Sequence, residues 1–208
     1  SIEMRRSDFQ AFAWMLDSGA FTRITTGRGH MPIRAYADHI RRWSVCGNLQ
    51  AAVTQDYMCE PFVLKLTGLT VHDHQTMTLA NYLRLRDALG DDAYVLPVLQ
   101  GYAPKDYQVH IAMYGHDLLP GAWCGVGSVC KRNSTVHEVE RVLEAIHFVR
   151  PDLRLHGFGI KKTALSSHLV NDMLYSCDSM AWSYRARREG RDQNGPREAE
   201  RYEKEIAE

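Results

Sequence analysis

Short apolar runs alternate with longer amphipathic stretches along most of this 208-residue chain. Strands that alternate with helices in this way are typical of βα units around a parallel sheet. The strand candidates are residues 11–16, 49–54, 93–99, 122–126, 153–158 and 180–182. The helix candidates, with apolar residues at roughly helical spacing, are residues 33–46, 71–89, 105–115, 135–149 and 163–174. The pattern predicts an α/β fold.

The number of strand candidates narrows the choice of α/β fold. A closed (β/α)8 barrel has eight strands and typically runs to about 250 residues. We therefore expect a compact, TIM-barrel-like fold that is incomplete, or whose first strand is trimmed from the N-terminus or goes unrecognised. The last segment is polar and almost without large apolar side chains. We expect a catalytic (β/α) barrel over residues 1–188 and a polar linker and helix over residues 189–208.

Composition excludes several classes of protein. With 45% hydrophobic and 24% charged residues the chain has ordinary globular values. No run approaches the roughly 18 apolar residues of a membrane-spanning helix, and no signal peptide opens the chain. Lys plus Arg and Asp plus Glu both number 25, so any contact with nucleic acid must come from a local basic patch.

The five cysteines are scattered along the chain. None is spaced as Cys-x-x-Cys, so they predict neither a disulfide framework nor a zinc knuckle. A reducing compartment fits this usage best. We therefore expect a cytoplasmic protein.

Polar side chains and glycine turns follow the predicted strands. In parallel α/β proteins the carboxyl ends of the strands converge, and reactive residues gather there. Each residue also has a simpler explanation, because a lone Asp after a strand commonly caps a helix and a His is as often a buried core residue. Their joint occurrence indicates acid/base or nucleophilic chemistry by carboxylates and leaves the substrate open. The side chains at these positions are Asp17, Asp56, Gln100, His156 and Asp178.

Six sequence blocks occur in order at the same positions. They are LDSGAF at 16–21, QDYMCEP at 55–61, VLQGY at 98–102, GVGSVCKR at 125–132, LHGFGIK at 155–161 and DSMAWS at 178–183. With these blocks, over about residues 14–188, the chain resembles the tRNA-guanine transglycosylase superfamily. It resembles more closely the small DNA-directed branch, the DpdA-like deazapurine DNA modification proteins.

The resemblance implies a (β/α)8 barrel that exchanges a guanine base in a polynucleotide for a deazaguanine. The exchange is a double displacement at the sugar carbon C1′. By motif, Asp178 matches the nucleophile that forms a covalent glycosyl-enzyme intermediate, and Asp17 matches the acid/base aspartate. A carboxylate suits the first role because it can attack an oxocarbenium-like centre and later leave.

The resemblance also implies a base-binding set. Asp56 and Gln100 match the residues that read the purine edge, where a carboxylate accepts and a carboxamide both donates and accepts. Gly125 and Gly127 match a glycine turn that leaves room for the base. We assign Ser18 and His156 to the same set.

The chain departs from the tRNA enzymes in two ways. Those enzymes carry a zinc site of three Cys and one His after the nucleophile, whereas residues 190–208 contain no Cys or His. We therefore expect no zinc site and no cofactor. The chain is also much shorter than those enzymes, which favours DNA over tRNA. The expected partners are DNA and a free 7-deazaguanine base, with no membrane, in the cytosol of a bacterium or a phage-infected host. A monomer and a homodimer both stay open.

A polynucleotide substrate needs contacts to its phosphates, which Lys and Arg supply. An alternative is a solvated basic face that is balanced by the acids after residue 188. The enzyme would flip its target base or act on single strands. The candidate contacts are Lys131, Arg132, Lys161, Lys162, Arg185, Arg187 and Arg188.

Together these observations predict a DNA-guanine transglycosylase that inserts a 7-deazaguanine, such as 7-cyano-7-deazaguanine. One alternative is a DNA base glycosylase of the same superfamily, in which water resolves the intermediate. The other is a non-catalytic nucleic-acid-binding member.

Overall fold

Seven parallel strands form the framework of the described part of the chain. The structure is a computed structural model that describes residues 10–130, 135–193 and 195–207. The strands pair in sequence order, as β1-β2-β3 in one sheet and β4-β5-β6-β7 in the other. They are β1 Ala11–Leu16, β2 Gly47–Val53, β3 Val95–Leu96, β4 Val98–Leu99, β5 Trp123–Val126, β6 Arg154–Gly157 and β7 Leu174–Cys177.

Pro97 divides the two sheets. Because proline has no N–H, the strand ladder is interrupted between β3 and β4. The chain nevertheless stays extended: the Thr54 N–H donates to the Leu96 carbonyl at 3.2 Å, and the Gly125 N–H donates to the Pro97 carbonyl at 2.8 Å. Residues 95–99 therefore act as one segment that joins β2 to β5, as the predicted strand at 93–99 requires.

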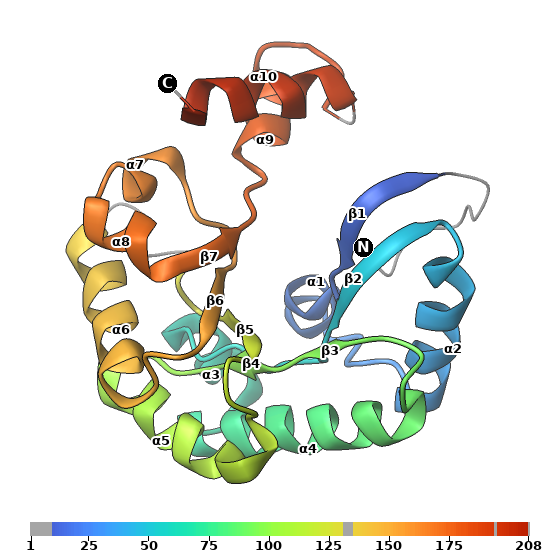
Figure 1. The fold of residues 1–208 in the computed structure, drawn as a ribbon, viewed down its shortest axis with the longest axis vertical. Helices are drawn as coiled ribbons and strands as arrows, with labels where there is room; N and C mark the ends of the chain where they lie inside the picture. The colour runs from blue at the N-terminus through green and yellow to red at the C-terminus, as the bar shows by residue number, and fades with distance from the viewer. Residues whose placement is uncertain (1–9, 131–134, 194, 208) are drawn as a thin grey trace.

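Helices cover the outer side of the strands. In Figure 1, α2, α4, α5 and α6 follow one another around an arc, with the strands along its inner side and β1 and β7 at its two ends. The main core lies between strands and helices and contains the fully buried Tyr36, Trp43, Tyr107 and Tyr114. The helices are α1 Ala20–Thr25, α2 Ile33–Ser44, α3 Pro61–Thr67, α4 Val71–Leu89, α5 Pro104–Tyr114, η1 Gly115–Asp117, α6 Val136–Val149, α7 Lys162–Leu165, α8 His168–Met173, α9 Ala181–Arg188 and α10 Pro196–Ala207.

A smaller core lies where Ala51, Val53, Leu96 and Val98 pack with Trp123 and Phe158. Within the described residues β1 and β7 each have a single partner strand and do not pair with each other. The parallel α/β fold is confirmed, whereas closure into an eight-stranded barrel is not and stays a prediction.

The predicted strand at 180–182 is wrong. The last strand is β7, Leu174–Cys177, and the chain becomes helical at Ala181. The side chains of β7 alternate between half-buried and exposed, as expected of an edge strand. In the sequence, Leu174 continues the helical spacing of the apolar residues before it, which is why the predicted helix included it. The predicted helix at 163–174 is in fact α7 and α8, because Ser167 begins a new helix by accepting the Val170 N–H at 3.3 Å. The short helices α1 and α3 were not predicted.

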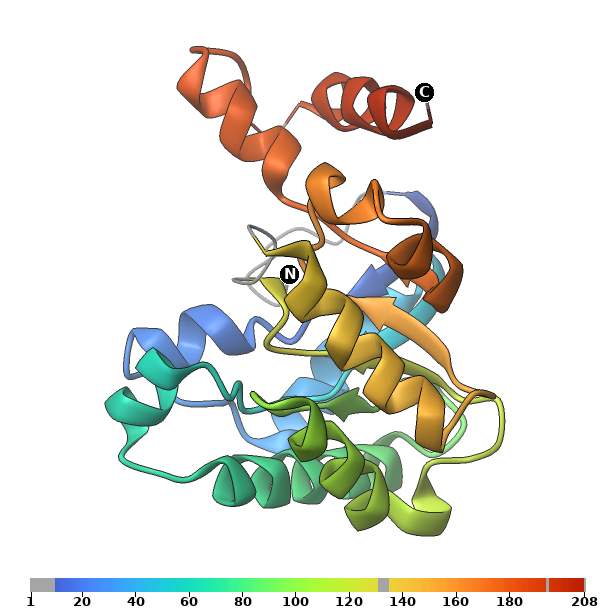
Figure 2. The same ribbon diagram turned by 90° about the vertical axis from the view of Figure 1, so that its left-hand side faces the viewer.

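Helices α9 and α10 project from one end of the molecule, away from α4 and α5 (Figures 1 and 2). They pack against each other. The predicted boundary after residue 188 falls at the end of α9, and it stays a prediction. None of the helices in the described ranges is both long and apolar enough to cross a lipid bilayer.

Candidate active site

A cavity of about 200 Å³ opens at the carboxyl ends of the strands. It is smaller than the roughly 300–1,000 Å³ of sites for drug-sized ligands, which suits a small molecule. Phe21 and Phe158 supply aromatic surface to its wall. The polar residues that line it follow successive strands, as predicted, and they include Asp17, Asp56, Gln100 and Asp178.

Asp17 follows β1 at the mouth of the cavity. Gly19, with a left-handed φ of 70°, turns the chain into α1 so that its N–H points back to the Asp17 carboxylate. Although Asp17 is exposed at the mouth, surrounding protein desolvates its carboxyl group and raises its pKa. The Gly19 N–H opposes this shift, and the negative charge of Asp178 adds to it. A carboxyl group with a raised pKa is suited to hold and release a proton.

Asp178 follows β7, and its side chain is 50% exposed. Its Oδ1 accepts the Gly159 N–H at 2.9 Å. Its own N–H donates to the Gly157 carbonyl at 3.3 Å. The pairing of β6 with β7 therefore fixes this carboxylate at the mouth, close enough to Asp17 for the two charges to interact.

Asp56 and Gln100 form a buried polar pair. Gln100 Nε2 donates to Asp56 Oδ2 at 2.5 Å. Burial, together with the smaller effect of the Asp17 charge, raises the pKa of Asp56 to about 7, against the opposing effect of the Gln100 hydrogen bond. The Gln100 carboxamide nitrogen carries a second hydrogen besides the one given to Asp56. The pair therefore places hydrogen-bond donors and acceptors side by side at the cavity wall.

The backbone around Gln100 is fixed on two sides. The Gln100 N–H donates to His110 Nδ1 at 2.8 Å, and Gln75 Nε2 donates to the Gln100 carbonyl at 2.7 Å. A Cβ atom at Gly127 would lie 2.2 Å from Gln100 Nε2, so any larger residue there would displace the Gln100 carboxamide. At Gly125 a Cβ atom would lie 2.3 Å from the Phe158 ring. The two glycines thus make room for Gln100 and Phe158, which themselves line the cavity.

Glu60 and Ser128 are site residues to which the sequence analysis gave no role. Glu60 is buried, and its Oε2 lies 2.9 Å from Ser128 Oγ. The same hydroxyl lies 2.8 Å from Gln100 Oε1 and accepts the Cys59 N–H at 2.8 Å. Ser128 has a left-handed φ of 57°, a strained conformation that often marks functional sites. The signal in the sequence is the position of Glu60 directly before Pro61. Glu60 is the N-cap residue of α3, but its side chain does not cap the helix.

Ser18 and His156 lie behind the cavity wall. Ser18 is fully buried, and its hydroxyl has no hydrogen-bond partner among the described residues. His156 is 2% exposed and packs edge-on against Trp123 and Phe158. It does not line the cavity, and its Nε2 lies 3.5 Å from Asp178 Oδ1.

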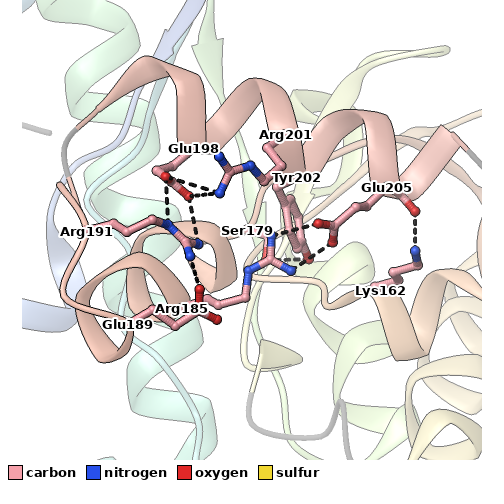
Figure 3. A network of polar contacts seen from close by, with 9 residues as sticks. All are labelled: Lys162, Ser179, Arg185, Glu189, Arg191, Glu198, Arg201, Tyr202 and Glu205. Atoms are coloured by element: carbon pink, nitrogen blue, oxygen red, sulfur yellow. Dashed lines mark hydrogen bonds and ion pairs between the residues drawn. The ribbon is translucent and has the colours of Figure 1, made fainter.

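Two of the predicted DNA contacts, Lys162 and Arg185, are tied to α10 (Figure 3). Arg185 donates to both carboxylate oxygens of Glu205, at 2.8 and 2.9 Å. The Lys162 ammonium donates to the Glu205 carbonyl. Arg191 is held in the same way by Glu198, at 2.9 and 3.0 Å, and also pairs with Glu189. Acids of the C-terminal segment therefore neutralise part of this basic cluster.

The remaining predicted contacts differ in their surroundings. Arg187 and Arg188 are exposed, and their guanidinium groups lie 5.8 and 6.0 Å from the ring centre of Tyr184. Lys161 is exposed at the start of α7. Lys131 and Arg132 lie outside the described residues. Arg187 and Arg188 thus present the most accessible positive charge on α9.

Metal ligands of the Cys and His type are sparse in the segment that follows Asp178. Residues 190–208 contain no Cys or His. Within the described ranges, no three His, Cys, Asp or Glu residues are grouped so that they could hold a metal ion. The expectation of no zinc site stays a prediction.

The fold and the cavity define a class of protein. Polar and acidic side chains gathered at the carboxyl ends of parallel strands are typical of the active sites of α/β enzymes. The sequence model of the family DpdA, DeoxyPurine in DNA protein A, matches residues 4–196, and the chain belongs to this family. No curated protein matches the chain. Membership confirms the resemblance and implies a DNA-modifying enzyme of deazapurine modification, with DNA as its partner.

Proposed function

We propose that the protein is a DNA-guanine transglycosylase that exchanges guanine in DNA for a free 7-deazaguanine base. The observation that carries the proposal is the buried pair of Asp56 and Gln100 in a cavity whose mouth holds Asp17 and Asp178. The pair would read the base, and the two carboxylates at the mouth would act on the bond between base and sugar.

In the first step a carboxylate oxygen of Asp178 forms a bond to C1′ as the bond from C1′ to N9 of guanine breaks. The electron pair of that bond leaves with the base, which takes a proton from Asp17. The raised pKa of Asp17 supports this role, since it keeps the proton available nearer neutral pH. The product is a covalent glycosyl ester of Asp178.

In the second step the deazaguanine N9 attacks C1′ and the ester bond breaks. Its N9 proton passes to Asp17, and the Asp178 carboxylate is released. The reaction neither oxidises nor reduces the base, so we propose that it needs no cofactor. We further propose a (β/α)8-type barrel, which the successive parallel strands β1 to β7 support. We also propose a cytosolic reaction, which the absence of disulfides from the described cysteines fits.

The function is tested with DNA that carries radiolabelled guanine. We expect label to be released when a free 7-deazaguanine is added and little release without it. Release without added base, leaving abasic sites, would establish the glycosylase instead. Binding of DNA with no release under either condition would establish a non-catalytic member.

DNA contacts are tested by comparing two changes on α9. Arg187→Ala with Arg188→Ala should weaken DNA binding severalfold and reduce the slope of log K against log salt concentration by about 1–2, because each phosphate contact contributes roughly 0.9. Salt-dependent fluorescence titrations measure both quantities. Arg185→Ala should leave the slope nearly unchanged, because Glu205 already neutralises Arg185. An equal loss of slope in both variants would show that Glu205 releases Arg185 to DNA.

A further inference from the structure

His156 lies next to the carboxylate that we propose as the nucleophile, yet it does not line the cavity. We propose that His156 is a positioning residue: its Nε2–H holds Oδ1 of Asp178, so that Oδ2 is the atom that attacks C1′. This inference rests on the proposed function. It gives His156 a role different from the base contact that the sequence led us to expect.

The position of His156 is fixed by its packing. It lies on β6 opposite Ser176 of β7 and is 2% exposed. Its ring packs edge-on between Phe158, 4.8 Å away, and Trp123, 6.1 Å away, measured between ring centres. The ring therefore cannot swing toward solvent without disrupting this aromatic cluster.

The neighbouring hydrogen bonds indicate which ring nitrogen carries the proton. Trp123 Nε1, which can only donate, lies 3.0 Å from Ser176 Oγ. That hydroxyl lies 2.9 Å from His156 Nδ1 and can donate its hydrogen to it. The imidazole proton then sits on Nε2. The opposite tautomer would place the Nε2 lone pair 3.5 Å from the Asp178 carboxylate, where the two would repel.

His156 Nε2 also needs a partner. Within the described part of the chain this buried nitrogen has no hydrogen bond, and such an unpaired group costs free energy. Asp178 Oδ1, at 3.5 Å, comes within hydrogen-bond distance after a shift of a few tenths of an ångström. Catalytic hydrogen bonds are commonly long before the substrate binds and tighten in the complex.

Two donors then point at one oxygen, because Oδ1 already accepts the Gly159 N–H at 2.9 Å. Holding Oδ1 restricts rotation of the carboxylate and leaves Oδ2 for the bond to C1′. In the intermediate Oδ1 is the carbonyl oxygen of the ester. When the incoming base breaks the ester, the same two donors stabilise the negative charge that returns to the carboxylate.

The test compares His156→Met with His156→Gln, because glutamine keeps an N–H donor and methionine does not. We expect His156→Met to slow formation of the covalent DNA adduct about 10- to 100-fold in single-turnover experiments, the range for a lost hydrogen bond to a charged group. His156→Gln should restore part of the rate. The KM for the free base should not change, since His156 touches neither substrate. The matched control is His39→Met, a half-buried His packed edge-on against Trp43 with ring centres 5.0 Å apart.

Adduct formation at the wild-type rate in His156→Met would overturn the proposal. An equal loss of adduct-formation rate in His156→Met and His156→Gln, together with a lowered Tm, would also overturn it, because His156 would then be a structural core residue. Nitrogen NMR of the imidazole tests the proposal independently of activity. We expect the Nε2–H tautomer in the wild-type protein and a loss of that fixed tautomer in Ser176→Ala. A proton on Nδ1 alone in the wild-type protein would overturn the proposal even if exchange is normal.

Discussion

Asp178→Asn should lower the rate of base exchange by several powers of ten, as expected when a covalent catalyst loses its nucleophile. The amide oxygen can still accept the Gly159 N–H, so the loop after β6 should keep its conformation and Tm should change little. The measurement is guanine exchange together with a denaturation-resistant protein–DNA adduct on a gel. Wild-type protein should give this adduct, and the variant should not.

The control for this change is Asp172→Asn, which removes an exposed carboxylate from α8 a short distance along the chain. It should exchange bases at the wild-type rate. Exchange at that rate in Asp178→Asn as well would refute the assignment of the nucleophile. An adduct that persists in Asp178→Asn would place the covalent bond on another residue.

The fold could be predicted where apolar runs are clearly bounded. Residues 11–16 and 71–89 match β1 and α4, because each run ends at a polar residue or glycine. The strand β7 could not be found in this way. It is an edge strand with exposed Tyr175 and Cys177, so its pattern is weak, and only its pairing with β6 makes it a strand. The interruption of the strand ladder at Pro97 could not be predicted either, because it depends on which strands pair in the folded protein.

The residues that line the cavity could be predicted because the carboxyl ends of parallel strands converge. That rule, with the resemblance, predicted the residues that the cavity brings together, Asp17, Asp56, Gln100 and Asp178. It could not show that Gln100 occupies the space that Gly127 leaves, or that Glu205 neutralises Arg185, since both depend on contacts between distant segments. It also could not separate a base contact from a positioning role for His156. The catalytic and binding roles themselves stay predictions.

The protonation of Asp56 should set the pH dependence of base recognition. Its pKa is raised to about 7, mainly by burial, so the carboxyl group is largely protonated below that pH. The ionised form offers acceptor oxygens to both the ring N–H and the exocyclic amine of guanine, whereas protonation turns one oxygen into an O–H donor. We expect the affinity for guanine and deazaguanine to rise as pH increases through about 7 and then to level off. Base-exchange kinetics between pH 5.5 and 8.5 measure this as a falling KM.

Asp56→Asn should remove that dependence and weaken base recognition by about two powers of ten, because its amide hydrogens would face the donors of the base and leave buried groups unpaired. DNA binding in a salt titration should change little, since the basic residues of α9 carry it.

The stability of the folded protein depends on the same ionisation in the opposite direction, which gives an independent test. The pKa of Asp56 is 3.8 in the unfolded chain and about 7 in the folded protein, so the folded protein binds this proton more tightly. Stability therefore falls as the pH rises between these two values. Asp56→Asn should therefore raise Tm at pH 8 more than at pH 5. A collapse of DNA affinity with normal exchange per bound complex would instead make Asp56 a structural residue.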